Sequence, residues 1–309
     1  MPPALAVAGP TASGKSALAL ALAERLGGWV INADALQVYR DLRVLSARPT
    51  AAEEARVPHR LYGVLDGAER CSAGRWLAFA RAAVVEARAA GALPILCGGT
   101  GLYLKALEEG LAPVPPVPPE VEAEERARFE AEGGAARLAA LAAADPGTVA
   151  RLAPADRQRI VRAWAVLRAT GRPLSAWRRE PGEGGLPLRW TVLLPPREVL
   201  REAAARRWQA MLAGGALEEV RALLARRLDP ALPVMKAVGV RELAGVLAGE
   251  RSLEAAGEAA VAATRQYLKR QASWLRTQVR PSHAEAVWLD AKFSDLDVEE
   301  VVRKIREGG

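Results

Sequence analysis

The sequence predicts an α/β fold in which helices cover a parallel sheet and a helical insertion interrupts it. Apolar segments at 4–9, 29–34 and 93–97 have the composition of short buried strands, and helical segments at 14–26 and 73–90 separate them. Strands that alternate with helices usually form a parallel sheet, because each helix carries the chain back across the sheet.

A change in composition after residue 111 predicts the insertion. Residues 112–119 contain five prolines, which break helices, and 120–172 is rich in Ala, Arg and Glu, which is typical of helices. A second break at 181–185, Pro-Gly-Glu-Gly-Gly, precedes an expected strand. We therefore expect a core of residues 1–115 and 187–309 and a helical insertion of residues 116–186. The later core elements are a strand at 190–194, helices at 196–213, 215–226, 239–248 and 252–278, and a strand at 286–290.

Composition and charge limit which kind of binding partner and which cellular compartment we expect for the protein. The 309 residues carry a net charge of +7 with a pI near 9.8, which fits either a polyanionic partner or mere solubility. Two cysteines without a CxxC motif argue against a disulfide framework or a zinc site and favour a reducing cytoplasm. The N-terminus has no basic leader and no apolar run spans a bilayer, so we expect no membrane association, and we expect a monomer.

A phosphate-binding loop is the most specific local motif. The segment matches G-x-x-x-x-G-K-[ST], follows an expected strand and opens an expected helix, which predicts a P-loop NTPase-like core. Backbone N–H groups and the helix N-terminus would bind a di- or triphosphate, Lys15 would contact outer phosphate oxygens, and Ser16 would reach Mg²⁺. The loop residues are Gly9, Pro10, Thr11, Ala12, Ser13, Gly14, Lys15 and Ser16.

Two acids follow apolar strands and are candidates for a role beside this loop. They are Asp34, which ends the second strand, and Asp290, which follows the last one. A carboxylate at the end of a strand next to the loop lies in the crevice where open α/β sheets bind ligands, so Asp34 could act as a base. The guanine-reading N-K-x-D pattern and the kinase catalytic-loop pattern are both absent.

Six ordered segments resemble the tRNA dimethylallyltransferase family and cover the chain almost end to end. Besides the phosphate loop they are Asp34–Tyr39, Gly98–Tyr103, Gln158–Ala163, Lys236–Arg241 and Thr264–Arg276. The resemblance implies that the loop binds the diphosphate of dimethylallyl diphosphate and that N6 of the adenosine 3′ of the tRNA anticodon is the acceptor. Because chemistry on a base requires it to leave its stack, the anticodon stem-loop would present a flipped base.

The resemblance also implies individual roles. Asp34 would be the general base, Thr100 would hydrogen-bond near the base or the diphosphate, and Arg207, in a segment like the family's Arg-x-x-x-Met, would bind diphosphate. The insertion would bind tRNA. The residues expected to contact tRNA are Asp34, Ala35, Leu36, Gln37, Gln158, Arg159, Ile160, Val161, Arg162, Lys236, Arg241, Arg265, Lys269, Arg270 and Arg276.

Three positions depart from the family pattern. Ala35 stands where the family usually has Ser, and Leu45–Pro49 replaces Gly-Thr-Ala-Lys-Pro. Glu122 stands where the family has an arginine that faces tRNA. These changes affect expected tRNA contacts, while the loop, Asp34 and the C-terminal basic segment remain.

Three other functions fit part of the sequence. A small-molecule kinase would share the loop, but it would not need the long basic helix. An isopentenyltransferase acting on free AMP, ADP or ATP would not need the insertion. An RNA-binding P-loop ATPase would leave Asp34–Tyr39 without a purpose. Activity without ATP would separate a dimethylallyltransferase from the kinase and the ATPase.

Overall fold

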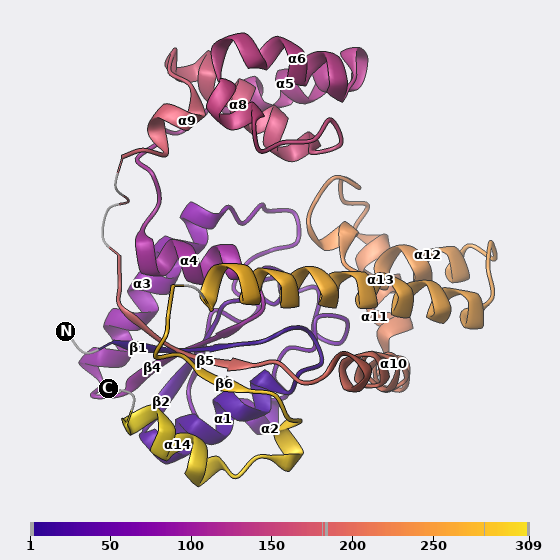
Figure 1. The fold of residues 1–309 in the computed structure, drawn as a ribbon. Helices are drawn as coiled ribbons and strands as arrows, with labels where there is room; N and C mark the ends of the chain where they lie inside the picture. The colour runs from indigo at the N-terminus through magenta and orange to yellow at the C-terminus, as the bar shows by residue number, and fades with distance from the viewer. Residues whose placement is uncertain (1–2, 181, 183–184, 281, 308–309) are drawn as a thin grey trace. The chain divides into compact units, whose positions relative to one another are not determined.

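The computed structural model describes residues 3–180, 182, 185–280 and 282–307 (Figure 1). The chain forms two compact units. Unit 1 consists of residues 1–108 and 186–309, and unit 2 consists of residues 109–185.

Unit 1 contains a six-stranded sheet in which all paired strands are parallel, in the order β3-β2-β4-β1-β5-β6. Because helices bury both faces, the central strands are apolar along their whole length, as β1 is. This arrangement confirms the predicted P-loop NTPase-like α/β class. The strands are β1 (Ala4–Ala8), β2 (Gly28–Asn32), β3 (His59–Arg60), β4 (Leu93–Gly98), β5 (Leu188–Leu193) and β6 (Val287–Leu289).

Helices lie on both faces of this sheet (Figure 1). One face is covered by α1 (Lys15–Leu26) and α14 (Val298–Glu307), whose apolar residues share one core with β1 and β4. The other face is covered by α3 (Ala73–Ala89) and α4 (Gly101–Glu109). The remaining helices are α2 (Ala51–Glu54), α10 (Arg197–Ala213), α11 (Ala216–Ala225), α12 (Val240–Leu247) and α13 (Leu253–Trp274), with a π-helical turn at Leu275–Val279 and 3₁₀ turns at Val234–Lys236 and Phe293–Asp295.

The second strand ends earlier than expected because of a local side-chain interaction. The Asn32 carboxamide accepts a hydrogen bond from Asp34 N at 2.8 Å and donates one to Asp34 O at 3.0 Å. This turn competes with continued strand pairing, so β2 stops at Asn32 instead of residue 34. Asp34 is thereby placed in the loop that follows the strand.

Unit 2 is helical, as predicted, but it begins at Glu109 instead of residue 116. Val114 and Val117, in the proline-rich segment, pack against a core that includes Leu141 and Val166, so this segment belongs to the unit and is not a linker. The chain rejoins unit 1 where Leu186 N donates to Leu107 O at 2.9 Å. Its helices are α5 (Pro119–Glu132), α6 (Gly134–Ala144), α7 (Pro146–Val149), α8 (Arg157–Thr170) and α9 (Leu174–Trp177).

A buried ion cluster holds the helices of unit 2 together. The Glu125 side chain is fully buried and pairs with Arg137 and with Arg168, whose Nη1 lies 2.7 Å from Glu125 Oε1. The Arg137 guanidinium also lies 4.4 Å from the centre of the Trp164 ring. Because a buried carboxylate without partners is strongly destabilising, this cluster fixes the packing of α5, α6 and α8.

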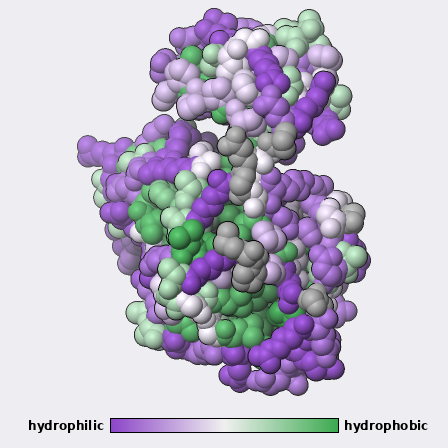
Figure 2. Space-filling model, turned by 90° about the vertical axis from the view of Figure 1, so that its left-hand side faces the viewer, coloured by the Kyte–Doolittle hydropathy of each residue, from purple (hydrophilic) through white to green (hydrophobic). Residues whose placement is uncertain are grey.

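Hydrophilic residues cover most of the visible surface of unit 2, while apolar residues gather on the visible face of unit 1 (Figure 2). Among the described residues, no helix combines the length and the apolar composition that crossing a membrane requires.

We expect Gly98→Ala to destabilise the protein, because a Cβ at this position would lie 2.1 Å from the backbone oxygen of Ala33. The backbone would have to move, at a cost of about 3 kcal/mol in the free energy of unfolding. Gly249→Ala is the matched control, since it adds a Cβ with no atom within 4 Å at a φ of +73° and should cost about 1 kcal/mol. Urea unfolding measures both, and equal losses would contradict the close approach at Gly98.

Candidate active site

The phosphate loop has the backbone that an anion site requires. Gly14 and Ala12 adopt positive φ angles of 92° and 62°, which turn the chain from β1 into α1. A Cβ at Gly9 would lie 2.6 Å from Leu193 O, so only glycine fits there. The Ser13 hydroxyl is buried and has no hydrogen-bond partner within the described part of the chain, as expected of a polar group that contacts a bound ligand.

Lys15 is held inside the loop. Its side chain is buried, and Nζ lies 3.4 Å from Pro10 O. Burial lowers the pKa of Lys15, and the nearby charge of Asp34 raises it in part. An ammonium group with so little hydration interacts strongly with an incoming anion.

Asp34 is oriented by the turn described above and by the loop that follows it. Its Oδ1 accepts a hydrogen bond from Leu36 N at 3.0 Å. The other carboxylate oxygen has no hydrogen-bond partner among the residues that the structure describes. One oxygen therefore fixes the carboxylate, while the second remains available to accept a proton.

Thr100 connects Asp34 to the end of β4. Its Oγ1 accepts a hydrogen bond from Ala35 N at 3.0 Å, and its own N–H donates to Ala33 O at 3.3 Å. The side chain of Tyr267, on α13, lies beside Thr100. Burial and the charge of Asp34 raise the pKa of Tyr267 to about 12, so the phenol stays protonated at neutral pH.

Arg207, on α10, adds a second cation, which is half-buried. Its Nη2 donates to Ser46 O at 3.2 Å. Burial lowers the pKa of the Arg207 guanidinium, and the charge of Asp34 opposes this effect. Because Arg207 also lowers the pKa of Lys15, the two cations and Asp34 lie within electrostatic range of one another. Asp290, the alternative acid, is exposed after β6, the edge strand of the sheet.

The residues present fit a magnesium ion only as a companion of bound phosphate. Among the described residues, no group of three or more His, Cys, Asp or Glu side chains could hold a metal ion. The exposed Ser16 hydroxyl is the one protein ligand that the loop pattern provides. Mg²⁺ commonly binds through few protein ligands, water and substrate phosphates, so this donor set suits it.

Helix α13 supplies two site residues that the sequence did not assign. Gln271 is buried, accepts a hydrogen bond from Thr11 N at 2.9 Å and donates one to Gly99 O at 3.0 Å. Tyr267 lies one turn earlier and therefore faces the same side of the helix. That spacing of four in Thr264–Arg276 was the signal that could have identified both.

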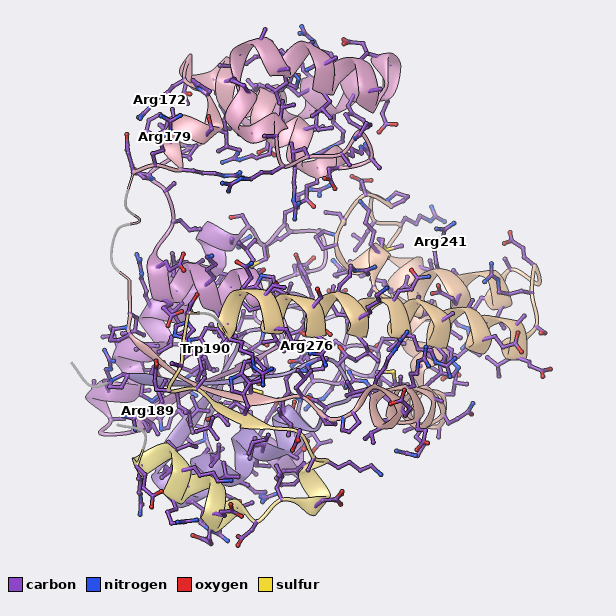
Figure 3. All side chains as sticks on the ribbon, in the orientation of Figure 1. Arg172, Arg179, Arg189, Trp190, Arg241 and Arg276 are labelled. Carbon is purple, nitrogen blue, oxygen red and sulfur yellow. The ribbon has the colours of Figure 1, made fainter. Side chains whose placement is uncertain are left out.

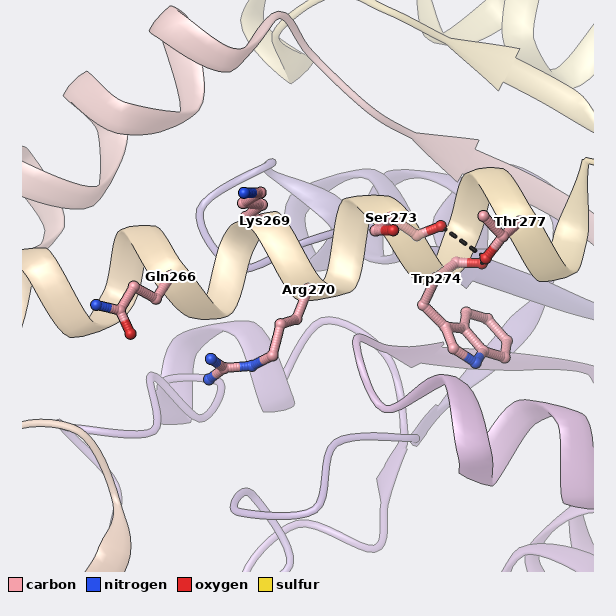
Figure 4. A pocket seen from close by; sticks show the side chains of 6 residues that line it. All are labelled: Gln266, Lys269, Arg270, Ser273, Trp274 and Thr277. Atoms are coloured by element: carbon pink, nitrogen blue, oxygen red, sulfur yellow. Dashed lines mark hydrogen bonds between the residues drawn. The ribbon is translucent and has the colours of Figure 1, made fainter. Parts of the chain in front are cut away.

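The expected tRNA contacts divide into exposed and buried residues. Exposed basic residues extend along α13, and a groove of about 560 Å³ is lined by Gln266, Lys269, Arg270, Ser273, Trp274 and Thr277 (Figure 4). Arg241 and Arg276 lie on α12 and on the π-helical turn (Figure 3). The exposed candidates are Gln158, Arg159, Lys236, Arg241, Arg265, Lys269, Arg270 and Arg276, and Ala35 and Leu36 are half-buried.

Three expected tRNA contacts need correction. Ile160 and Val161 are buried in unit 2, because they lie on the apolar side of α8, so their side chains cannot contact RNA in this structure. Gln37 is also buried, and its amide donates to Ser46 O and Ala47 O, where it supports a loop.

Arg162, also expected to contact tRNA, is half-buried on α8. It forms an ion pair with Glu122 at 2.9 Å. The glutamate at the position where the family has an arginine thus neutralises a neighbouring cation.

Fold and site together define a P-loop α/β protein with a carboxylate beside its anion loop. Residues 37–278 match the IPP transferase family model, and the chain therefore belongs to that family. It is 57% identical to a tRNA dimethylallyltransferase of Rhodospirillum rubrum over 97% of this chain and 93% of the relative.

Solved structures agree with this assignment. A tRNA isopentenylpyrophosphate transferase from Bacillus halodurans has a TM-score of 0.68 and 29% identity, with 98% of this chain and 97% of that chain covered. A eukaryotic dimethylallyltransferase described as acting on tRNA has a TM-score of 0.83 and 26% identity, with 98% and 77% covered.

We expect the affinity for inorganic diphosphate to fall as the pH rises. The fall should begin before the pH reaches 10.5, the ordinary lysine value, because the pKa of Lys15 is lowered. The ammonium form binds the anion, so affinity is full below the lowered pKa and falls as the pH rises through it. Calorimetric titration from pH 7 to 11 measures this decline. Lys15→Met provides the reference, since the ratio of the two affinities cancels the titration of diphosphate itself; a ratio constant up to pH 10.5 would contradict the assignment.

Proposed function

We propose that the protein transfers the dimethylallyl group of dimethylallyl diphosphate to N6 of the adenosine at tRNA position 37, 3′ of the anticodon, and releases diphosphate. The observation that carries this proposal is the meeting of the phosphate loop, Asp34 and Thr100 at one edge of the sheet. The similarity of almost the whole chain to a tRNA dimethylallyltransferase supports it.

The loop, the buried Lys15 and the half-buried Arg207 would bind the diphosphate. As the bond between carbon C1 and oxygen breaks, negative charge grows on the leaving diphosphate. Lys15, Arg207 and the loop N–H groups are already fixed where this charge develops, so little reorganisation is needed. Mg²⁺ held at Ser16 would neutralise part of the same charge.

Asp34 would accept the proton of the acceptor amine. An exocyclic adenine amine is a weak nucleophile, because its lone pair is delocalised into the ring. As the bond between N6 and C1 forms, one N6 proton passes to the free carboxylate oxygen of Asp34. Thr100 positions this carboxylate through Ala35 N.

The tRNA anticodon stem-loop would bind to exposed basic side chains. The stripe on α13 combines cations with Trp274, a combination that suits a phosphate backbone with unstacked bases. Arg159 and Gln158 on α8 would provide further contacts in unit 2. A cytoplasmic location follows from this substrate, and a monomeric state stays a prediction.

Unit 2 favours a tRNA acceptor over a free nucleotide. AMP, ADP or ATP would be bound at the edge of the sheet alone, so a separate helical unit of residues 109–185 would have no task. A small-molecule kinase would likewise have no task for unit 2 or for the exposed basic residues of α13.

Single-turnover transfer of labelled dimethylallyl tests the proposal, with magnesium and without ATP. We expect label on an anticodon stem-loop with adenosines at and beside position 37, and none on AMP. Label on AMP alone would indicate a free-nucleotide enzyme, and an absolute ATP requirement would exclude the proposed reaction.

We expect Asp34→Ala to lower the single-turnover rate about 10²- to 10⁴-fold, the usual contribution of a general base. Diphosphate should bind no more weakly, because the substitution removes a negative charge near Lys15. Asp290→Ala, at an exposed acid after β6, is the matched control and should leave the rate unchanged. Normal turnover of Asp34→Ala would remove this carboxylate from the mechanism.

A further inference from the structure

Gln271 joins α13 to the phosphate loop through two hydrogen bonds made by one buried side chain. Its Oε1 accepts the N–H of Thr11, and its Nε2 donates to Gly99 O. The fit is tight, since a Cβ at Gly99 would lie 2.2 Å from Gln271 Nε2. Trp274, three residues later, lies against Gly101 in the same way.

The position of Thr11 determines what this contact does. Backbone N–H groups at the start of α1 bind the phosphate nearest the helix, and the earlier part of a P-loop serves phosphates farther along a polyphosphate. Thr11 lies in that earlier part, three residues before Gly14. Its N–H is occupied by a side chain of the protein itself, so it is not free to bind an anion.

We propose that Gln271 determines the phosphate specificity of the loop by limiting it to a diphosphate. Its carboxamide occupies both the N–H donor and the space that a third phosphoryl group would need. This inference rests on the proposed function, because it assigns a residue to the choice between a prenyl diphosphate and a nucleoside triphosphate. It explains how a P-loop with an intact G-x-x-x-x-G-K-[ST] pattern would act without ATP.

A purely structural role predicts something different. If Gln271 only attached α13 to the loop, its removal would weaken binding of every anion to the same extent. If it selects by phosphate number, its removal should change the ratio between a triphosphate and a diphosphate. That ratio is the quantity to measure.

Titration calorimetry with inorganic diphosphate and inorganic tripolyphosphate, in one magnesium-containing buffer, tests the proposal on the full-length protein. We expect Gln271→Ala to improve the affinity for tripolyphosphate relative to diphosphate about tenfold, the value of one hydrogen bond to a charged group. Gln209→Ala, at an exposed glutamine on α10, is the control and should leave the ratio unchanged. An unchanged ratio in Gln271→Ala, or equal weakening of both anions, would overturn the proposal.

A second measurement uses the wild-type protein and does not depend on the variant folding. Amide hydrogen exchange at Thr11 should be slow without ligand and should stay slow when diphosphate is added, since Gln271 holds this N–H throughout. Fast exchange without ligand, or protection that appears only with diphosphate, would contradict the assignment. Transfer of dimethylallyl to the stem-loop, measured on the same preparation, separates failure of this inference from failure of the proposed function.

Discussion

The site depends on the close pairing of the ends of β2 and β4. Ala33 donates its N–H to Cys97 O at 2.8 Å, and its carbonyl accepts the N–H of Thr100 at 3.3 Å. Gly98 lies between these two bonds with no room for a Cβ. Because the following loop begins at Asp34, this pairing sets the distance between the carboxylate and Thr100. The parallel neighbour β1 then brings the phosphate loop to the same edge of the sheet.

Burial strengthens the electrostatic interactions of the charged groups in the site. Lys15 and Arg207 lose hydration, and the lowered pKa of each records that cost. Asp34 offsets part of it, so the cations and the carboxylate stabilise one another while no anion is bound. When a diphosphate enters, it joins cations that are already positioned and poorly hydrated. The same buried environment raises the pKa of Tyr267, beside Thr100, so the phenol stays protonated at neutral pH.

Local sequence patterns predicted much of the fold, because the signals for a buried strand or a helix start lie in residues that are adjacent in the sequence. The phosphate loop, the strands β1, β2, β4, β5 and β6, and the helices α1, α3, α10, α11 and α12 lie within two residues of their expected positions. The short strand β3 and the helices α2, α4 and α14 were not expected. The Asn32 turn and the start of unit 2 at Glu109 depend on contacts that composition does not reveal. Gln271 was visible only as part of a family segment, since its two partners are far away in sequence. Ile160 was expected to contact tRNA from the family segment, but it is buried. Helical spacing alone would have placed it on the apolar face of α8.

Helix α13 offers an explanation of how the chain can have an intact phosphate-loop motif and yet be expected to act without ATP. A motif fixes the backbone that binds phosphate, but it leaves open what occupies the rest of the loop. Here a helix from the far end of the chain brings Gln271 to Thr11 and Tyr267 to Thr100, one turn apart. The outer surface of the same helix carries the exposed cations Lys269 and Arg270. One helix would thus connect phosphate selection on its inner side with binding of the nucleic acid on its outer side, so a change that tilts α13 should affect both substrates together.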